Sequence, residues 1–255
     1  MASRAGTDRA ASEDRWVALT GDRATLLAVA DGMGGTVGGG DAASAALAAL
    51  VDSMTGTAPV DLQALRSAVD AAHDRVRGLA VDGTPAALRG GTTLTAVVAT
   101  GRRLHLAHAG DSSCWLLRRG RLGRLTEVHT SAAALVAAGA VERGSVAERR
   151  LGGLLTRFLG MPGRVCPQLA TVRLRPGDRL LVATDGVTRA LPLPVLGELL
   201  SRPGAGAADL VAAVAAAGGR DDATALLAGV GSDVDTGVPA GNTRYATERT
   251  EVRAG

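Results

Sequence analysis

The chain has 255 residues, 46% apolar and 21% charged, and this composition is typical of one globular domain with a sizeable buried core. Its formal net charge is only +3 and its basic residues are spread along the sequence, which does not indicate a nucleic-acid-binding protein. All 28 basic residues are arginines, so chemistry that needs a P-loop, Schiff-base or general-base lysine is excluded.

The two cysteines, Cys114 and Cys166, lie far apart and lack CxxC spacing, so neither a disulfide framework nor a structural zinc site is predicted. A reducing compartment is therefore indicated. The N-terminal residues are polar, and no apolar run approaches the roughly 20 residues of a membrane span. We expect a cytoplasmic, monomeric protein that binds neither nucleic acid nor membrane.

The first predicted strand leads into a glycine-rich loop. An apolar run at 25–30 stops at Asp31, and glycine dominates residues 32–40. The loop does not fit the GxGxxG spacing of a dinucleotide site, because Val37 occupies the place of the last glycine. We therefore expect the chemistry of this segment at Asp31, at the strand end.

Two helices are predicted after this loop. Asp41 is the expected N-cap of an alanine-rich helix that ends near Met54, and Asp61 is the expected N-cap of a second helix. In the second helix, apolar residues recur at helical spacing from Leu62 to Leu79. We expect both helices to cover a sheet.

Closely spaced strand signals then predict antiparallel hairpins. These strands occupy residues 93–99, 104–108, 112–117 and 122–125. A helix with an irregular polar segment, a candidate mobile flap, follows at 131–150. Residues 169–174 and 180–184 are predicted to form another hairpin through the turn at 176–177, ending at Asp185.

The C-terminal part contains two more predicted helices, at 193–200 and 207–217, and a last strand at 223–230. Beyond about residue 231 the sequence is polar and lacks periodicity, which is typical of disorder. We therefore divide the chain into one domain at 1–230 and a disordered polar tail at 231–255.

Four aspartates share one setting, because each lies beside a strand end and next to a small residue. They are Asp31, Asp111, Asp185 and Asp221. Mg²⁺ and Mn²⁺ prefer oxygen ligands, and a sheet fixes the position of such carboxylates while the loops leave room for water and substrate. One aspartate of this kind is usually a turn residue. Four in one chain favour a metal site.

Other catalytic centres have less support. His105 and His108 are separated by an odd number of residues on a predicted strand, so they face opposite sides and cannot chelate one ion together. No GxSxG elbow is present, so a serine hydrolase is not indicated.

Seven stretches of the sequence resemble, in order, those of the metal-dependent protein phosphatases of type 2C, in the form found in the bacterial branch. They lie at residues 9–14, 29–35, 91–94, 108–112, 151–160, 183–186 and 218–222. Each stretch alone is a weak signal. Together they extend the resemblance over residues 9 to about 230.

The resemblance implies an α+β fold, namely a four-layer α-β-β-α sandwich of two antiparallel sheets flanked by helices. It implies a binuclear centre of two Mn²⁺ or Mg²⁺ ions, which activates water for attack on phosphoserine or phosphothreonine. The expected substrates are phosphorylated proteins, themselves targets of a serine/threonine kinase.

The resemblance also assigns metal ligands. Asp31 would bridge both ions, the carbonyl of Gly32 would bind one of them, and Asp185 with Asp221 would bind the other. Asp222 stands where the family commonly has asparagine, so a shift of register is open, although Asp221 fits better.

Further roles follow from the same resemblance. Glu13 and Asp14 would hold metal-bound waters, and Arg9 would clamp the phosphate with its planar guanidinium. The alternative for Arg9 is a solvated side chain. Asp111 is a third-metal ligand in many relatives, and a turn or supporting role is its alternative here.

The chain departs from the family at Arg189, where relatives usually have a second aspartate. A guanidinium beside Asp111 or Asp185 would repel a third divalent ion and offset the excess carboxylate charge. In the flap, Val128 replaces an acidic residue that often precedes the histidine, here His129. This change bears on substrate choice.

Two other functions stay open. The first is a non-catalytic sensory or binding module with the phosphatase fold. The core carboxylates argue against it, because an inactive relative has no need of like charges held in one cleft. The second is a phosphatase of small phosphorylated metabolites.

Overall fold

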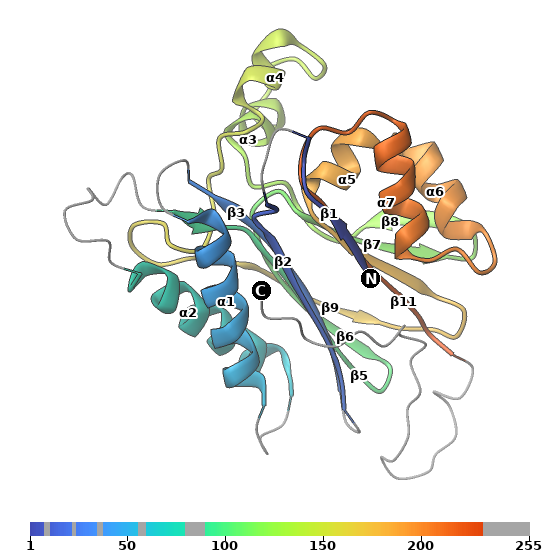
Figure 1. The fold of residues 1–255 in the computed structure, drawn as a ribbon. Coiled ribbons are helices and arrows are strands. Elements are labelled where there is room, and N and C mark those ends of the chain that lie inside the picture. The colour runs from blue at the N-terminus through green and yellow to red at the C-terminus, as the bar shows by residue number, and fades with distance from the viewer. Residues whose placement is uncertain (8–10, 22–23, 35–37, 56–59, 80–89, 232–255) are drawn as a thin grey trace.

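The computed structural model describes residues 1–7, 11–21, 24–34, 38–55, 60–79 and 90–231. Over these residues the chain forms two antiparallel sheets packed face to face, with helices on both outer faces (Figure 1). The predicted four-layer α+β sandwich is confirmed. Arg9 and the predicted tail, apart from its first residue, lie outside the described residues.

The larger sheet has the strand order β2-β3-β5-β6-β9, and β4 pairs with the end of β3. Its strands are β2 (Asp14–Thr20), β3 (Thr25–Met33), β4 (Gly91–Thr92), β5 (Leu94–Thr100), β6 (Arg103–Ala109) and β9 (Gln168–Arg173). The smaller sheet has the order β1-β11-β10-β7-β8. Its strands are β1 (Ala2–Arg4), β7 (Ser113–Arg118), β8 (Arg121–Arg124), β10 (Arg179–Ala183) and β11 (Ala223–Gly229).

Two groups of helices cover the sheets, and a third pair extends from one end of the sandwich (Figure 1). The helices over the larger sheet are α1 (Gly39–Met54) and α2 (Leu62–Arg77). Those over the smaller sheet are α5 (Asp185–Ala190), α6 (Leu193–Ser201) and α7 (Ala207–Ala216). The pair at the end, α3 (Ser131–Ala137) and α4 (Val146–Leu151), lies in the predicted flap. No helix among the described residues is both long and apolar enough to cross a membrane.

The side chains of the strands alternate between the two faces of each sheet and so contribute to three apolar layers. One lies under α1 and α2, one between the two sheets, and one under α5, α6 and α7. On β3, Ala28 and Ala30 pack toward α1 and α2, whereas Leu27 and Val29 pack between the two sheets. Because successive side chains of a strand point to opposite faces, a strand buried on both sides is apolar throughout. The sandwich core thereby fixes the strand ends that carry the candidate site.

The helix start at Asp61 is confirmed, because its Oδ1 accepts a hydrogen bond from the backbone N of Ala64 at 2.8 Å. The prediction for Asp41 is wrong. Helix α1 begins at Gly39 with Gly38 as its N-cap, and Asp41 lies in the first turn. A carboxylate there still favours the positive end of the helix dipole.

The predicted hairpin of residues 169–174 and 180–184 is also wrong. Strand β9 pairs with β6 in the larger sheet, whereas β10 pairs with β7 and β11 in the smaller one. The turn at 176–177 therefore carries the chain from one sheet to the other. The physical reason is burial. Strand β10 is buried on both faces and lies in the interior of the smaller sheet, between β11 and β7. Strand β9 is partly exposed and lies at the edge of the larger sheet.

Candidate metal centre

Three aspartates from different elements meet at one end of the sandwich. Asp31 lies on β3, Asp111 precedes β7, and Asp185 is the first residue of α5, directly after β10. One carboxylate oxygen from each lies within 4.8 Å of the others. The structure thus brings together three of the four aspartates that the sequence singled out.

Asp31 is held by its backbone. Its carbonyl accepts a hydrogen bond from the backbone N of Thr93 at 2.9 Å, and its own N donates to Oγ1 of Thr93 at 3.0 Å. Strand β3 continues to Met33 instead of stopping at Asp31, because its end pairs with β4. The carboxylate therefore projects from a rigid strand.

Asp14 adds a further carboxylate, since it is the cross-strand partner of Asp31. The Asp14 side chain is buried, and its Oδ2 accepts a hydrogen bond from Oγ1 of Thr184 at 2.8 Å. Two carboxylates directly opposite each other on adjacent strands repel.

Glycine after Asp31 and Asp185 is a steric requirement. A Cβ on Gly32 would clash with the carbonyl of Gly39 at the start of α1, and a Cβ on Gly186 would clash with the carbonyl of Asp222. Backbone packing at both points leaves no room for a side chain. The repeated Asp-Gly pair thus reflects close packing next to the cluster as well as chemistry.

Arg189 lies among the carboxylates. Its Nη2 is 2.6 Å from Oδ2 of Asp185 and 3.3 Å from Oδ2 of Asp111, and its Nη1 is 3.3 Å from Oδ2 of Asp221. The position beside Asp111 and Asp185 is the one expected from the sequence. The contact with Asp221 was not expected.

The protonation of the cluster reflects burial and mutual repulsion. Burial raises the pKa of Asp14 to about 7, and burial followed by repulsion from Asp111 raises the pKa of Asp185 to about 7. Burial and the neighbouring carboxylates, Asp14 first, raise the pKa of Asp31 well above its ordinary value. A positive charge among these groups favours their ionised form, as Arg189 already does for Asp185.

Two buried oxygens of the cluster, Oδ1 of Asp14 and Oδ1 of Asp185, have no hydrogen-bond partner among the described residues. Buried polar atoms are normally satisfied, so such a pair calls for an explanation. Hard divalent cations such as Mn²⁺ and Mg²⁺ prefer carboxylate oxygens. The donor set therefore fits a metal centre.

The adjacent aspartates at the end of the last loop have different surroundings. Asp222 is buried, and its two oxygens accept hydrogen bonds from the backbone N atoms of Gly6 (2.6 Å) and Glu13 (2.8 Å). Asp221 is 39% exposed and faces Arg189. Asp222 thus anchors the N-terminal segment, which leaves Asp221 as the candidate ligand, and its metal role stays a prediction.

The two histidines of β6 face opposite sides, as expected. The ring of His108 is buried and lies 2.8 Å from Oγ1 of Thr95, whereas that of His105 lies 3.0 Å from Oγ1 of Thr171. Burial lowers the pKa of His108 to about 3, so its ring is neutral at pH 7. Neither histidine belongs to the cluster.

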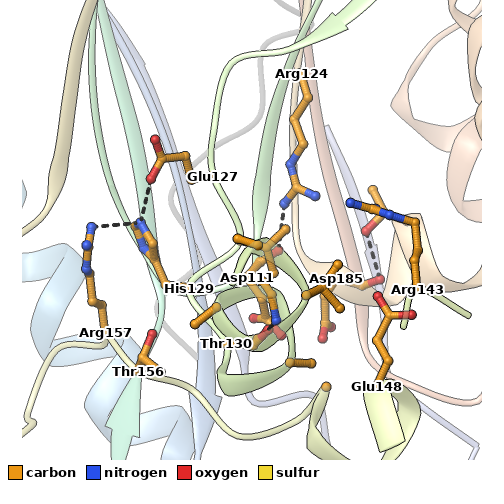
Figure 2. Close-up of a pocket in the computed structure, with 18 of the residues that line it drawn as sticks. Asp111, Arg124, Glu127, His129, Thr130, Arg143, Glu148, Thr156, Arg157 and Asp185 are labelled. Atoms are coloured by element: carbon orange, nitrogen blue, oxygen red, sulfur yellow. Dashed lines mark hydrogen bonds and ion pairs between the residues drawn. The ribbon is translucent and has the colours of Figure 1, made fainter. Parts of the chain in front are cut away.

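A pocket of about 690 Å³ opens beside the cluster and is lined by Asp111, Asp185 and Arg189 together with residues of the flap. Three further arginines line it and are labelled in Figure 2, where Arg157 lies beside His129: Arg124, Arg143 and Arg157. Arg124 is fixed, because its Nη2 donates to the carbonyl of Asp111 at 3.2 Å and its guanidinium lies 5.5 Å from the ring centre of Trp115.

Sequence reasoning missed most of this arginine lining. Arg157 belongs to one of the seven stretches, but no role was assigned to it, and Arg124 and Arg143 had no signal at all. Their approach to the site depends on the β7–β8 hairpin and on the flap, which sequence spacing does not determine.

The sequence profile of the family described as Protein phosphatase 2C matches residues 5–228. The serine/threonine protein phosphatase PstP of Mycobacterium tuberculosis is 34% identical over 216 residues, which cover 81% of this chain and 40% of that protein. The chain thus spans about two-fifths of the length of this relative.

Solved structures agree with the profile. A serine/threonine phosphatase of S. agalactiae superposes with a TM-score of 0.79 at 26% identity, covering 89% of this chain and 96% of that one. The catalytic domain of PstP in complex with two manganese ions gives 0.73 at 32% identity, covering 89% and 94%. From its sequence and its fold together, the chain belongs to the protein phosphatase 2C family.

Proposed function

We propose that this chain is a metal-dependent protein serine/threonine phosphatase. The observation that carries the proposal is the cluster of Asp31, Asp111 and Asp185, which opens onto a pocket with several arginines in its lining. Two buried carboxylate oxygens at this cluster have no hydrogen-bond partner in the described part of the chain. Relatives in the family are serine/threonine phosphatases, and one was solved with two manganese ions.

The donors proposed for two Mn²⁺ or Mg²⁺ ions are all oxygens: the carboxylates of Asp31, Asp185 and Asp221 and the carbonyl of Gly32. When bound, the cations supply Lewis-acid polarisation and a nucleophile at neutral pH. The chain itself orients that nucleophile through Glu13 and Asp14, whose backbone positions are fixed by Asp222 and by β3. Asp111 contributes a further carboxylate at the edge of the pocket.

The phosphorylated side chain is proposed to enter the arginine-lined pocket. Arg9 is the residue proposed to clamp phosphate oxygens, and Arg124, held against Trp115, adds positive charge to the pocket. Arg157 lies beside His129. Burial and the positive charge of Arg157 lower the pKa of His129 to about 4. The neutral ring leaves the positive charge of Arg157 available to an anionic substrate.

The proposal extends to the biological setting. The substrates are proteins phosphorylated by a serine/threonine kinase, and the enzyme acts as a cytoplasmic monomer. Residues 1–230 form the catalytic domain, and residues 231–255 form a polar tail.

The test uses protein stripped of metal and then titrated with Mn²⁺, assayed on a chromogenic phosphate monoester and on phosphothreonine peptides. We expect Mn²⁺-dependent turnover of both. Asp185→Asn should lower turnover at least a hundredfold while the metal-free fold stays as stable as wild type, because the change removes a ligand charge and relieves repulsion. Asp74→Asn, an exposed change on α2, is the matched control.

Two outcomes would replace the proposal. Binding of Mn²⁺ without turnover would indicate the non-catalytic module. A kcat/KM far higher for small phosphorylated metabolites than for phosphopeptides would indicate a metabolite phosphatase.

A further inference from the structure

A second pocket, of about 610 Å³, lies at the opposite end of the sandwich, and we call it the distal arginine pocket. Its lining contains five arginines: Arg102, Arg118, Arg119, Arg173 and Arg175. Among the described lining residues, Asp178, directly before β10, is the single carboxylate. Asp178 and Asp185 flank β10 at its two ends, so the pocket lies roughly 20 Å from the metal centre.

These arginines are dispersed in sequence and gathered by folding. They come from the β5–β6 turn, the β7–β8 hairpin and the connection between β9 and β10. Two contacts join these segments: the backbone N of Leu174 donates to the carbonyl of Arg102 at 2.8 Å, and Nη2 of Arg118 donates to the carbonyl of Arg173 at 2.6 Å. The pocket is therefore built by ordered backbone.

The charge of the pocket is not balanced by its own carboxylate. Asp178 is buried, and both of its oxygens are used by Arg118, with Nε to Oδ1 at 2.9 Å and Nη2 to Oδ2 at 2.7 Å. Its Oδ2 also accepts the backbone N of Arg175 at 2.8 Å. One carboxylate thus neutralises one arginine.

Three other guanidinium groups of the pocket have no carboxylate partner among the residues that the structure describes. Within the described part of the chain, Arg119, Arg173 and Arg175 form no ion pair, and all three are exposed. Within the described residues, the pocket is therefore a concave surface whose arginines outnumber its carboxylates.

Arg119 carries a second signal. It is the one non-glycine residue with positive φ among those the structure describes, at φ 51°, and Gly120 follows at φ 74°. A two-residue hairpin turn with both φ values positive favours asparagine and glycine. An arginine in this conformation is strained, and such strain is typical of functional positions.

We propose that the distal arginine pocket binds a small anion that carries two or more phosphate groups. Guanidinium forks match phosphate oxygens two at a time, and several forks around one pocket match several phosphates. The volume lies in the range of small-molecule sites. The described lining holds no aromatic residue, so recognition rests on the phosphates and not on base stacking.

The proposal does not rest on the proposed phosphatase activity, and its test uses binding in EDTA, where the metal centre is silent. Inorganic tripolyphosphate is titrated calorimetrically into wild type and into the double variant Arg173→Glu/Arg175→Glu. The control, Arg75→Glu/Arg164→Glu, makes the same change of charge at exposed positions outside both pockets. We expect the affinity to fall at least tenfold in the first variant and less than threefold in the control.

Arg119→Asn separates binding from folding. Asparagine tolerates positive φ, so this variant should melt at or above the wild-type temperature in anion-free buffer while binding tripolyphosphate several-fold more weakly. A nucleoside triphosphate is titrated as a second probe. Equal affinity identifies the phosphates alone as the ligand, and tighter binding identifies a nucleotide.

Three results would overturn the proposal. The first is the absence of tripolyphosphate binding by wild type. The second is binding that survives the Arg173→Glu/Arg175→Glu change, which would assign it to the pocket beside the metal centre. The third is tight binding of an acidic peptide in place of tripolyphosphate, which would identify a protein-docking surface.

Discussion

Replacing Arg189 with alanine removes a cation that contacts three aspartates of the site. Its shortest contact, 2.6 Å, is to Asp185, whose side chain is 9% exposed, and an unpaired buried charge of that kind costs about 3–5 kcal/mol. Arg189 itself is 52% exposed, however, and exposed pairs contribute only ~0.2–1 kcal/mol. Between these limits, we expect metal-free Arg189→Ala to lose about 1–2 kcal/mol of unfolding free energy.

The same contacts predict the opposite effect on metal affinity. A cation that binds Asp185 must displace the guanidinium from the carboxylate oxygen. Arg189→Ala removes this competition, so it should bind Mn²⁺ about tenfold more tightly, since ~1.4 kcal/mol is a factor of ten. Arg189→Asp should also add a weak third site beside Asp111, whereas wild type should bind two ions even at millimolar Mn²⁺.

The measurements are denaturant unfolding in EDTA at pH 8 and calorimetric Mn²⁺ titration. Arg202→Ala is the matched control, because Arg202 also forms a 2.6 Å pair at i,i+4 spacing, with the exposed Glu198. If Arg189→Ala matches this control in both stability and Mn²⁺ affinity, then Arg189 neither stabilises the metal-free cluster nor competes with the metal. A third Mn²⁺ in wild type would refute the view that Arg189 replaces a cation.

Three further predictions concern the centre and its surroundings. Gly32→Ala should lose at least ~2 kcal/mol of unfolding free energy, because its Cβ would clash with the start of α1, whereas Gly123→Ala, with open space around it, should be nearly neutral; equal losses would contradict the packing argument. Burial raises the pKa values of Asp14 and Asp185 to about 7 in the folded state, so the metal-free protein should lose stability as pH rises from about 4 to 7. A series of thermal melts in EDTA in which stability rises over this pH range would contradict the prediction. Arg9→Ala should raise KM for phosphopeptides and leave Mn²⁺ affinity unchanged, and a wild-type KM would return Arg9 to a solvated role.

Local signals in the sequence predicted most of the elements correctly. The Asp61 cap and the helical spacing after it correctly predicted α2, and the closely spaced strand signals correctly predicted the β5–β6 and β7–β8 hairpins. The pairing of β9 and β10 failed because it depends on which sheet covers each strand, a property of the whole sandwich. Turn residues at 176–177 fit a hairpin and a crossing between sheets equally well.

The candidate site was predictable to the extent that strand ends carry aspartates. Asp31 lies two residues before the end of β3, Asp111 lies between β6 and β7, and Asp185 begins α5, and the fold places these positions together. Most arginines of the two pockets were not predictable as neighbours, because they come from the strands β7, β8 and β9, from turns and from the flap, and only the fold brings them together. Arg189, expected beside Asp111 and Asp185, is the exception. Arginines spread along the chain gave no hint that several of them would line each of two pockets at opposite ends of one sandwich.

The substitution at Arg189 changes what metal binding does to this protein. Arg189 follows Asp185 at i,i+4 on α5, so their pairing is fixed by local helix geometry, whereas Asp111 and Asp221 reach the same guanidinium only through the fold. A carboxylate at this position would add to the repulsion that already raises the pKa values of the buried aspartates. The guanidinium instead balances part of that charge before any ion arrives. Metal binding is then an exchange of one cation for another, so it should weaken the contacts of Arg189 and expose its guanidinium to substrate phosphate at the edge of the pocket.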